Sequence, residues 1–351
     1  MRHHYHNFLN TISELDFRSL TDTSSLDGIG TMAPNTANTS PKKPNLASFR
    51  RKVQNHISLD DGEWKFHVSN LPPAQELDRR RLVKTLSLLT TKGRNEIVLT
   101  LETASDNRAI RADPLNRFLV ISIAEFRAPP RAQSSQSSPS DARSALQPLT
   151  PRECADYATR LLKAGVTLQG VHYNFYGHSN SQLKSRTCFL YAAPKDIISR
   201  KVESLGDFAK MKTVAKKAKR IGLLFSTAKV AMTVSPERVE DVPDIESADY
   251  IFTDGCGMIA PVLAQELSRR VGIVFRDRRY TPSVMQIRYR GYKGVVTVDP
   301  TMASSKKVLL EMRKSMKKFA GGDDHSFSVV EHSKVRRYPG HELPTSADTQ
   351  P

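Results

Sequence analysis

Cysteine is scarce in this sequence, and no long apolar run occurs. The three cysteines among 351 residues are Cys154, Cys188 and Cys256, and none belongs to a C-x-x-C pair. This spacing predicts neither a disulfide framework nor a structural zinc site, and it favours a reducing compartment. No stretch approaches the roughly 20 apolar residues that a membrane helix needs, and residues 1–7 lack the apolar region of a signal peptide. We therefore expect an intracellular protein of the nucleus or cytoplasm, with no membrane partner.

Acidic residues are also in short supply. The chain has 36 Asp and Glu against 53 Lys and Arg, which gives a formal net charge of +17. A basic excess of this size indicates a polyanionic partner, and nucleic acid is favoured over a membrane surface. Hydrophobic residues make up only 38% of the chain, which predicts disordered segments around one or two cores.

Composition divides the chain into ordered and disordered regions. Segments rich in Ser, Thr, Asn and Pro have too few large apolar side chains to offset the entropy lost on ordering. Strands and helices alternate irregularly elsewhere, which predicts an α+β fold or a closed β-barrel rather than a doubly wound sheet. The expected regions are a disordered arm (1–50), a small α+β region (51–127), a flexible linker (128–149), an α+β lead-in (150–220), a strand-rich region (221–320) and a disordered tail (321–351).

Periodicity and punctuation predict the helices and strands. The firmest signal is Thr150-Pro151 followed by Glu153, a capping box with proline at the first helical position, and Gly165 supplies the stop. The predicted helices cover 75–89, 151–164, 205–221 and 259–270. The predicted strands cover 96–101, 117–124, 166–176, 187–192, 230–234 and 250–253, with two more around Gly291.

The predicted helix 205–221 is strongly basic. Residues 210–220 hold six cations and no anion, and Lys216, Lys217 and Arg220 are among them. One interpretation is a helix that contacts phosphates, and the alternative of equal weight is a solvated helix face.

The strands around Gly291 alternate cleanly. Met285, Ile287 and Tyr289 share one face, whereas Arg288 and Arg290 share the other. This pattern predicts one packed face and one face that presents two guanidinium groups.

Charge is segregated along the second half of the chain. Residues 269–293 hold eight cations and one acid, and residues 306–318 hold six cations and one acid. Residues 237–254 hold seven acids and one cation. Basic elements brought together by folding would form a groove that displaces counterions from a phosphate backbone. Tyrosines among these cations could stack on bases, although burial is the alternative for at least two of them.

The segment Asp254-Gly255-Cys256-Gly257 combines a carboxylate with two glycines ahead of a predicted helix. One interpretation is a backbone loop whose N–H groups meet a phosphate. The alternative is a tight turn that needs a positive φ at glycine.

Four ordered segments resemble the cellular RNA-dependent RNA polymerases of RNA silencing. They are Y-I-F-T-D-G-C-G at 250–257, Q-I-R-Y-R-G-Y-K-G-V-V at 286–296, V-D-P at 298–300 and S-M-K-K-F at 315–319. The likeness runs from about residue 95 to residue 320. It departs from the family at Lys314, where proline is usual, and at Cys256, where an aliphatic residue is usual.

The resemblance implies an architecture and a set of contacts. The family places two double-psi β-barrels across a catalytic cleft, and residues 221–319 would supply most of the first barrel. Lys293 and a cation near Lys317 would face the incoming nucleotide or the RNA phosphates, with Arg288 and Arg290 beside them. Gly291, Tyr292 and Gly294 belong to the same motif as Lys293.

The resemblance also implies partners and a metal. They are an RNA template, nucleoside triphosphates and proteins of a silencing pathway, and Mg²⁺ held by an Asp-x-Asp-Gly-Asp loop of the second barrel. No such loop occurs in these 351 residues, so we expect no catalytic residue and no metal bound by this chain alone. Two interpretations stay open. The chain is an incomplete, inactive portion of an RNA-directed RNA polymerase, or it is a non-catalytic RNA-binding module derived from one.

Overall fold

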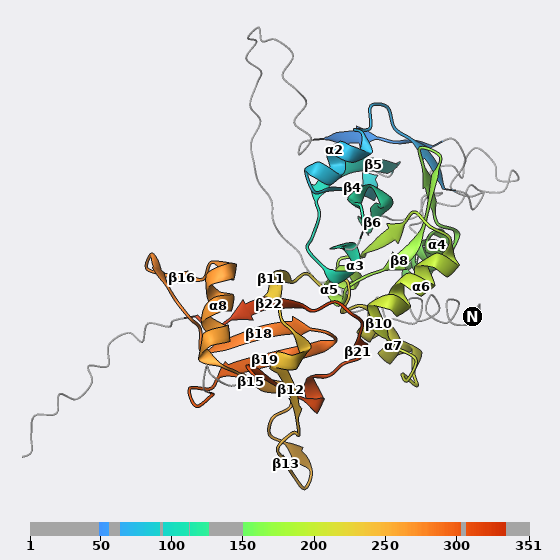
Figure 1. Cartoon of the computed structure of the whole chain (residues 1–351). Coiled ribbons are helices and arrows are strands. Elements are labelled where there is room, and N and C mark those ends of the chain that lie inside the picture. Colours follow the sequence, from blue (N-terminus) through green and yellow to red (C-terminus); the bar gives the residue numbers. More distant parts are fainter. Residues whose placement is uncertain are drawn as a thin grey trace, which may run out of the picture. The chain divides into compact units, whose positions relative to one another are not determined.

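The computed structural model describes residues 49–55, 64–91, 94–111, 113–125, 150–302 and 307–334 (Figure 1). The predicted linker and all but the end of the predicted arm lie outside these residues. The chain divides into two compact units, Met1–Thr227 (unit 1) and Ala228–Pro351 (unit 2).

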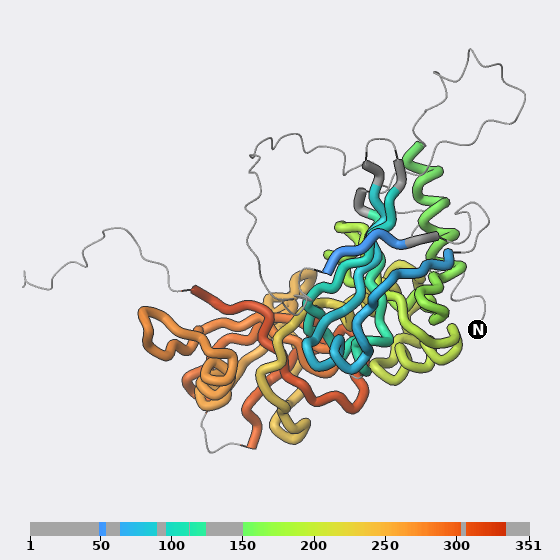
Figure 2. Tube along the Cα trace, turned by 90° about the horizontal axis from the view of Figure 1, so that it is seen from above, coloured from blue at the N-terminus to red at the C-terminus, as the bar shows by residue number. Residues whose placement is uncertain are grey.

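One nine-stranded sheet organises unit 1. Its strand order is β1-β5-β4-β6-β9-β8-β7-β3-β2, so regions 51–127 and 150–220, expected to be separate, build a single sheet. The two regions join where β6 pairs antiparallel with β9, and Figure 2 shows their traces running side by side. The strands are β1 (Arg50–Lys52), β2 (Gln54–Asn55), β3 (Lys65–His67), β4 (Leu82–Thr91), β5 (Arg94–Thr103), β6 (Phe118–Glu125), β7 (Val166–Leu168), β8 (Val171–Gly177) and β9 (Thr187–Tyr191).

Six helices accompany this sheet in the described part of unit 1. The capping box predicted for α4 is present, because the Thr150 side chain accepts from the Glu153 amide and Glu153 reaches back to Thr150. Gly165 ends α4 at a φ of 83°, as predicted. The helices of unit 1 are α2 (Ala74–Arg79), α3 (Arg108–Arg111), α4 (Pro151–Ala164), α5 (Asn180–Lys184), α6 (Lys195–Leu205) and α7 (Val214–Ile221).

Two helix predictions in unit 1 are wrong. The segment 75–89 forms the short helix α2 and then turns at Arg81 (φ 53°) into β4. Leu86 and Leu88 are buried there at period two, so sheet packing overrides the helical propensity of the segment. The basic helix is also shorter than predicted, because 205–221 contains β10 (Gly206–Asp207) and a turn before α7.

A buried lysine lies within the core of unit 1. Lys84 on β4 is 5% exposed, and its ammonium donates to the Asn116 carbonyl at 2.7 Å and to the Tyr173 hydroxyl at 2.5 Å. Burial lowers the pKa of Lys84 from 10.5 to about 8, and the charge of Asp78 opposes this effect only in part. Holding this cation in the core therefore costs on the order of 3 kcal/mol at neutral pH.

We predict that Lys84→Met removes a pH-dependent gain in stability. Between pH 8 and 10.5 the unfolded chain binds the proton that the folded chain has lost, so the free energy of unfolding rises with pH. The free energy of unfolding of the wild type should rise by about 2 kcal/mol relative to that of Lys84→Met between pH 7.5 and pH 9.5. Denaturant unfolding followed by fluorescence of Trp64, the only tryptophan, reports on this unit. The control Lys184→Met changes an exposed lysine, and its free energy of unfolding should follow that of the wild type at every pH. If Lys84→Met and the wild type show the same dependence of unfolding free energy on pH, the prediction is wrong.

A seven-stranded sheet forms unit 2, in the order β11-β22-β18-β19-β15-β20-β12. Parallel pairs β12–β20 and β15–β19 sit among antiparallel ones, and the sheet curls around a core that α8 (Pro261–Val271) covers. Two small hairpins project from it, β13 (Glu246–Ser247) with β14 (Tyr250–Ile251) and β16 (Val274–Phe275) with β17 (Arg278–Arg279). The sheet strands are β11 (Lys229–Thr233), β12 (Val239–Val242), β15 (Cys256–Ile259), β18 (Val284–Tyr289), β19 (Tyr292–Val298), β20 (Leu310–Arg313) and β22 (Ser326–His332).

The predicted tail is wrong over its first part. β22 lies between β11 and β18 inside the sheet, and Phe327 and Val329 are 0% and 5% exposed. The polar residues and glycines around this strand led to the prediction of a disordered tail, because that prediction used composition alone. The strands predicted around Gly291 and the helix predicted at 259–270 are confirmed as β18, β19 and α8.

Glycines allow the backbones of unit 2 to cross closely. A side chain at Gly294 would overlap the Gly255 carbonyl, and one at Gly257 would overlap the Glu311 carbonyl. Gly291, at a φ of 87°, would similarly strike the Phe319 carbonyl. Only glycine permits these approaches, so the crossing of β15, β19 and β20 requires Gly257 and Gly294, and the segment at Phe319 requires Gly291.

We predict that Gly294→Ala destabilises unit 2 by about 2 kcal/mol or more. The new methyl group would displace the Gly255 carbonyl, which accepts the Val295 amide at 2.8 Å. Scanning calorimetry of the full chain measures the loss. Thr297→Ala on the same strand is the control and should change stability by only about 0.5 kcal/mol. A Gly294→Ala protein as stable as the control would refute the close approach.

Candidate nucleic-acid interface

The hairpin of β18 and β19 positions the predicted cations. In its register Arg288 faces Lys293 and Tyr289 faces Tyr292. The two turn residues, Arg290 and Gly291, have φ of 41° and 87°. Two consecutive positive φ values form the tight connection that suits the right-handed twist of a hairpin. The turn therefore fixes which side chains share a face.

Arg288, Arg290 and Lys293 form what we call the cationic face. Met285, Ile287 and Tyr289 are buried on the opposite side, as the alternation predicted, while Arg288 and Lys293 are half-buried. Like charges directly opposite each other on paired strands repel. The cationic face is therefore a place where an anion would relieve repulsion.

Arg288 has unused hydrogen-bonding capacity. Its Nε and Nη1 atoms, and Nε of Arg290, are shielded from solvent with no hydrogen-bond partner among the residues that the structure describes. Burial holds the pKa of Arg288 below its usual value. Shielded guanidinium donors without acceptors are costly, so a turn of the side chain that brought them to a phosphate oxygen would be favoured by a charge-assisted hydrogen bond.

Lys317 lies away from the cationic face. Its ammonium is 3.1 Å from Asp241 Oδ2 and 5.2 Å from the centre of the Tyr292 ring. The Tyr292 hydroxyl donates to the other oxygen of Asp241. Successive residues of a strand point to opposite faces, so Tyr292 and Lys293 direct their side chains apart. The Tyr292 hydroxyl, together with Asp241, raises the pKa of Lys317.

The Asp254 motif forms a turn between strands. The motif precedes a helix as predicted, but strand β15 lies between Gly255 and α8, so the turn does not adjoin the N-terminus of the helix. Its φ of 74° confirms the tight turn, and its amide is taken by the Ser315 hydroxyl at 3.0 Å. Asp254 is exposed. This segment therefore offers no row of free N–H groups for a phosphate.

A second carboxylate, Asp244, was missed by sequence reasoning. It accepts from the Ser315 hydroxyl at 2.6 Å, the Ser315 amide at 2.9 Å and the Thr253 hydroxyl at 3.1 Å. Partial desolvation raises the pKa of Asp244, but these hydrogen bonds outweigh it and hold the pKa below its usual value. Asp244 and Ser315 are 71 residues apart, and no local pattern signals such a pair.

The basic residues of α7 lie in unit 1. Lys216 is exposed, while Lys217 and Arg220 are half-buried. Thr213 caps the helix by accepting from the Lys216 amide at 3.3 Å. None of the residues of α7 is buried, which is consistent both with a phosphate-contacting helix and with a solvated face.

The described residues do not fit a Mg²⁺ site. Within the described ranges no group of three or more His, Cys, Asp or Glu side chains could hold a metal ion. Asp241 and Asp244 are engaged by hydroxyl and ammonium donors instead. The same ranges contain no helix long and apolar enough to cross a membrane.

Comparison with known proteins places the chain in a family. A family model for RNA-dependent RNA polymerase matches residues 95–338. RNA-dependent RNA polymerase 1 of Arabidopsis thaliana is 34% identical over 200 residues, which cover 54% of this chain and 17% of that protein. The probable RNA-dependent RNA polymerase 1 of Oryza sativa is 34% identical over 178 residues, which cover 50% of this chain and 23% of that protein.

A solved structure shows the same fold. The RNA-dependent RNA polymerase QDE-1 from Thielavia terrestris superposes with a TM-score of 0.52 at 18% identity, over 72% of this chain and 28% of that one. The predicted α+β class with a barrel-like polymerase sheet is thereby confirmed. The matched part of the chain spans less than a quarter of the length of each of these two curated relatives. From the family match and these relatives, we conclude that this chain belongs to the RNA-dependent RNA polymerase family, a family of nucleotidyltransferases.

Proposed function

We propose that the cationic face binds phosphates of RNA and of the incoming nucleoside triphosphate, as part of an RNA-directed RNA polymerase. The observation that carries the proposal is the pairing of Arg288 with Lys293, directly opposite each other on β18 and β19. Two shielded guanidinium nitrogens of Arg288 lack an acceptor within the described part of the chain. Such an arrangement costs stability unless an anion is bound.

Lys317 and α7 have different parts in this proposal. Lys317 already contacts Asp241, so RNA would have to compete with a carboxylate for its ammonium. Lys216, Lys217 and Arg220 would add a second set of phosphate contacts, which act through charge rather than through a preformed pocket.

Nucleotidyl transfer itself needs residues beyond these. Family members join nucleotides to an RNA 3′ end, and Mg²⁺ held by carboxylates would supply the charge stabilisation for that step. These 351 residues contain no Asp-x-Asp-Gly-Asp loop, and the described carboxylates form no metal cluster. We therefore propose that this chain binds RNA but does not catalyse transfer alone, which keeps a non-catalytic RNA-binding module as the second candidate.

We predict that Arg288→Glu/Lys293→Glu weakens binding of single-stranded RNA roughly tenfold or more, or about 1.4 kcal/mol or more. Each lost phosphate contact also reduces the slope of log affinity against log salt by about 0.7 for a single strand. Fluorescence anisotropy with a labelled oligonucleotide, measured over a salt series, gives both quantities.

Two further variants make this test specific. Lys216→Glu/Lys217→Glu tests α7 separately and should lower affinity if the helix contacts phosphates. Arg152→Glu/Lys184→Glu makes the same change in net charge at exposed positions elsewhere and should have a smaller effect. If all three variants lose RNA affinity equally, net charge alone explains the loss, and a dedicated cationic face is excluded.

We also predict that the 351-residue chain does not extend RNA when supplied with a template, nucleoside triphosphates and Mg²⁺. Incorporation of a radiolabelled nucleotide into RNA, read on a denaturing gel, measures the activity. Template-dependent extension that Arg288→Glu/Lys293→Glu abolishes would overturn the proposal that catalysis needs further carboxylates.

A further inference from the structure

The hairpin of β13 and β14 exposes an apolar face. Ile245, Tyr250 and Phe252 are 57%, 64% and 63% exposed, and all three lie on the same side because Phe252 pairs with Ile245. The rings of Tyr250 and Phe252 meet edge to face at 4.9 Å. Large apolar side chains gathered on one exposed face indicate an interaction surface.

Acidic side chains lie on the same hairpin. Asp249 is exposed in its turn, and Glu246, which pairs with Ile251, is exposed on the face opposite to the aromatic rings. Asp244 anchors the base of the hairpin through Ser315 and Thr253, and the Thr253 hydroxyl also accepts from the Ile245 amide at 2.9 Å. The aromatic face is therefore presented on a fixed base rather than on a loose loop. Its charge favours a basic partner and disfavours RNA.

A pocket with the opposite character lies elsewhere on unit 2. Its volume is about 540 Å³, within the range of ligand-binding pockets. Its apolar lining comes from α8, from β11 and from Leu309 just before β20, and the exposed Val274 and Phe275 follow the lining residue Ile273 in the sequence. Figure 1 shows α8 and β16 well apart from β13 within unit 2, so a hairpin does not fill the pocket of its own copy.

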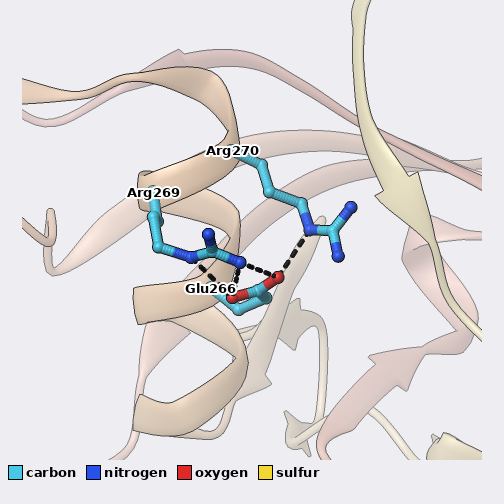
Figure 3. Close-up of polar contacts among 3 residues, drawn as sticks. All are labelled: Glu266, Arg269 and Arg270. Atoms are coloured by element: carbon cyan, nitrogen blue, oxygen red, sulfur yellow. Dashed lines mark hydrogen bonds and ion pairs between the residues drawn. The ribbon is translucent and has the colours of Figure 1, made fainter.

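Arginines dominate the charge of this pocket. Glu266 is neutralised locally, because Arg269 holds both its oxygens at 2.8 Å and Arg270 binds one at 2.5 Å (Figure 3). Arg238 and Arg279 also line the pocket, are exposed, and have no ion-pair partner among the described residues. The pocket therefore combines an apolar lining with uncompensated positive charge.

We propose that the β13–β14 hairpin of one copy docks into this pocket of a second copy. Tyr250 and Phe252 would enter the apolar part, and Asp249 in the turn of the hairpin would meet the exposed arginines Arg238 and Arg279. Aromatic side chains that enter pockets supply most of the energy of many interfaces, while the charges guide the encounter. Because the two surfaces differ, the contact is head-to-tail and continues into chains or rings. This inference does not depend on RNA binding.

The experiment measures the mass of the full 351-residue chain by sedimentation velocity over a concentration series. The wild type should associate, and association should weaken as salt rises because the ion pairs are screened. The hairpin variant Tyr250→Ser/Phe252→Ser and the pocket variant Arg238→Glu/Arg279→Glu should each be monomeric. All four side chains are exposed, so neither variant should disturb the fold, which circular dichroism verifies.

Mixing the two variants provides the decisive measurement. The mixture contains one intact pocket and one intact hairpin per pair, so dimers should form and growth should stop there. A symmetric contact between two hairpins would not be restored by mixing. The control pairs, Val171→Ser/Ile197→Ser and Arg152→Glu/Lys184→Glu, remove comparable apolar surface and charge in unit 1 and should associate like the wild type.

Several outcomes would overturn the proposal. They are a wild type that stays monomeric, association that persists in either variant, and a mixture that remains monomeric. If the pocket holds RNA instead, Arg238→Glu/Arg279→Glu would lower RNA affinity and leave the mass of the wild type and variant equal, which also excludes the second copy as occupant.

Discussion

The close crossing of backbones at the motif glycines is the constraint on which unit 2 depends. Gly294 and Gly257 let β19 and β20 approach their neighbours at distances that no side chain tolerates. That approach places the Gly255 carbonyl against the Val295 amide at 2.8 Å and so sets the register of β15 on β19. The register of β19 on β18 then decides that Arg288 and Lys293 share a face. The glycines of the motif thus determine, through backbone geometry, which side chains share the cationic face.

Lys84 and Arg288 show that the two units treat a cation within the fold differently. Lys84 is nearly fully buried, yet its ammonium has a carbonyl and a hydroxyl acceptor, so its cost is that of desolvation alone. Arg288 is less buried but keeps two nitrogens without an acceptor among the described residues. A satisfied polar group stabilises a unique core, whereas an unsatisfied one beside a like charge is retained at a cost. The contrast is the reason for which we assign a phosphate to Arg288 and not to Lys84.

How far the sequence predicts this protein depends on how local the determining interaction is. The capping box at Thr150 and the alternation of Met285 to Tyr289 are short-range signals, and both are confirmed. The helix predicted at 75–89 failed because pairing of β4 with β5 and β6 outweighs local propensity. β22 was missed because a strand within a sheet takes its stability from neighbours 40 to 100 residues earlier, as its pairing with Arg288 and Val230 shows. Composition carries no record of such neighbours.

The candidate site follows the same rule. The cations of the hairpin were predicted because alternation is visible over six residues.

The carboxylates of residues 237–254 could not be assigned from the sequence. Asp241 and Asp244 belong to one acidic stretch, but in the structure they make different contacts. Asp241 binds Tyr292 and Lys317, and Asp244 binds Ser315, each across more than 50 residues. Two of the exposed acids, Glu246 and Asp249, stand on the hairpin whose base Asp244 secures. Segregation of charge along this chain therefore says little about what each acid does. Asp241 and Asp244 hold a lysine and a backbone segment in place, whereas other acids of the same stretch stay exposed, and only contacts across more than 50 residues separate the two kinds.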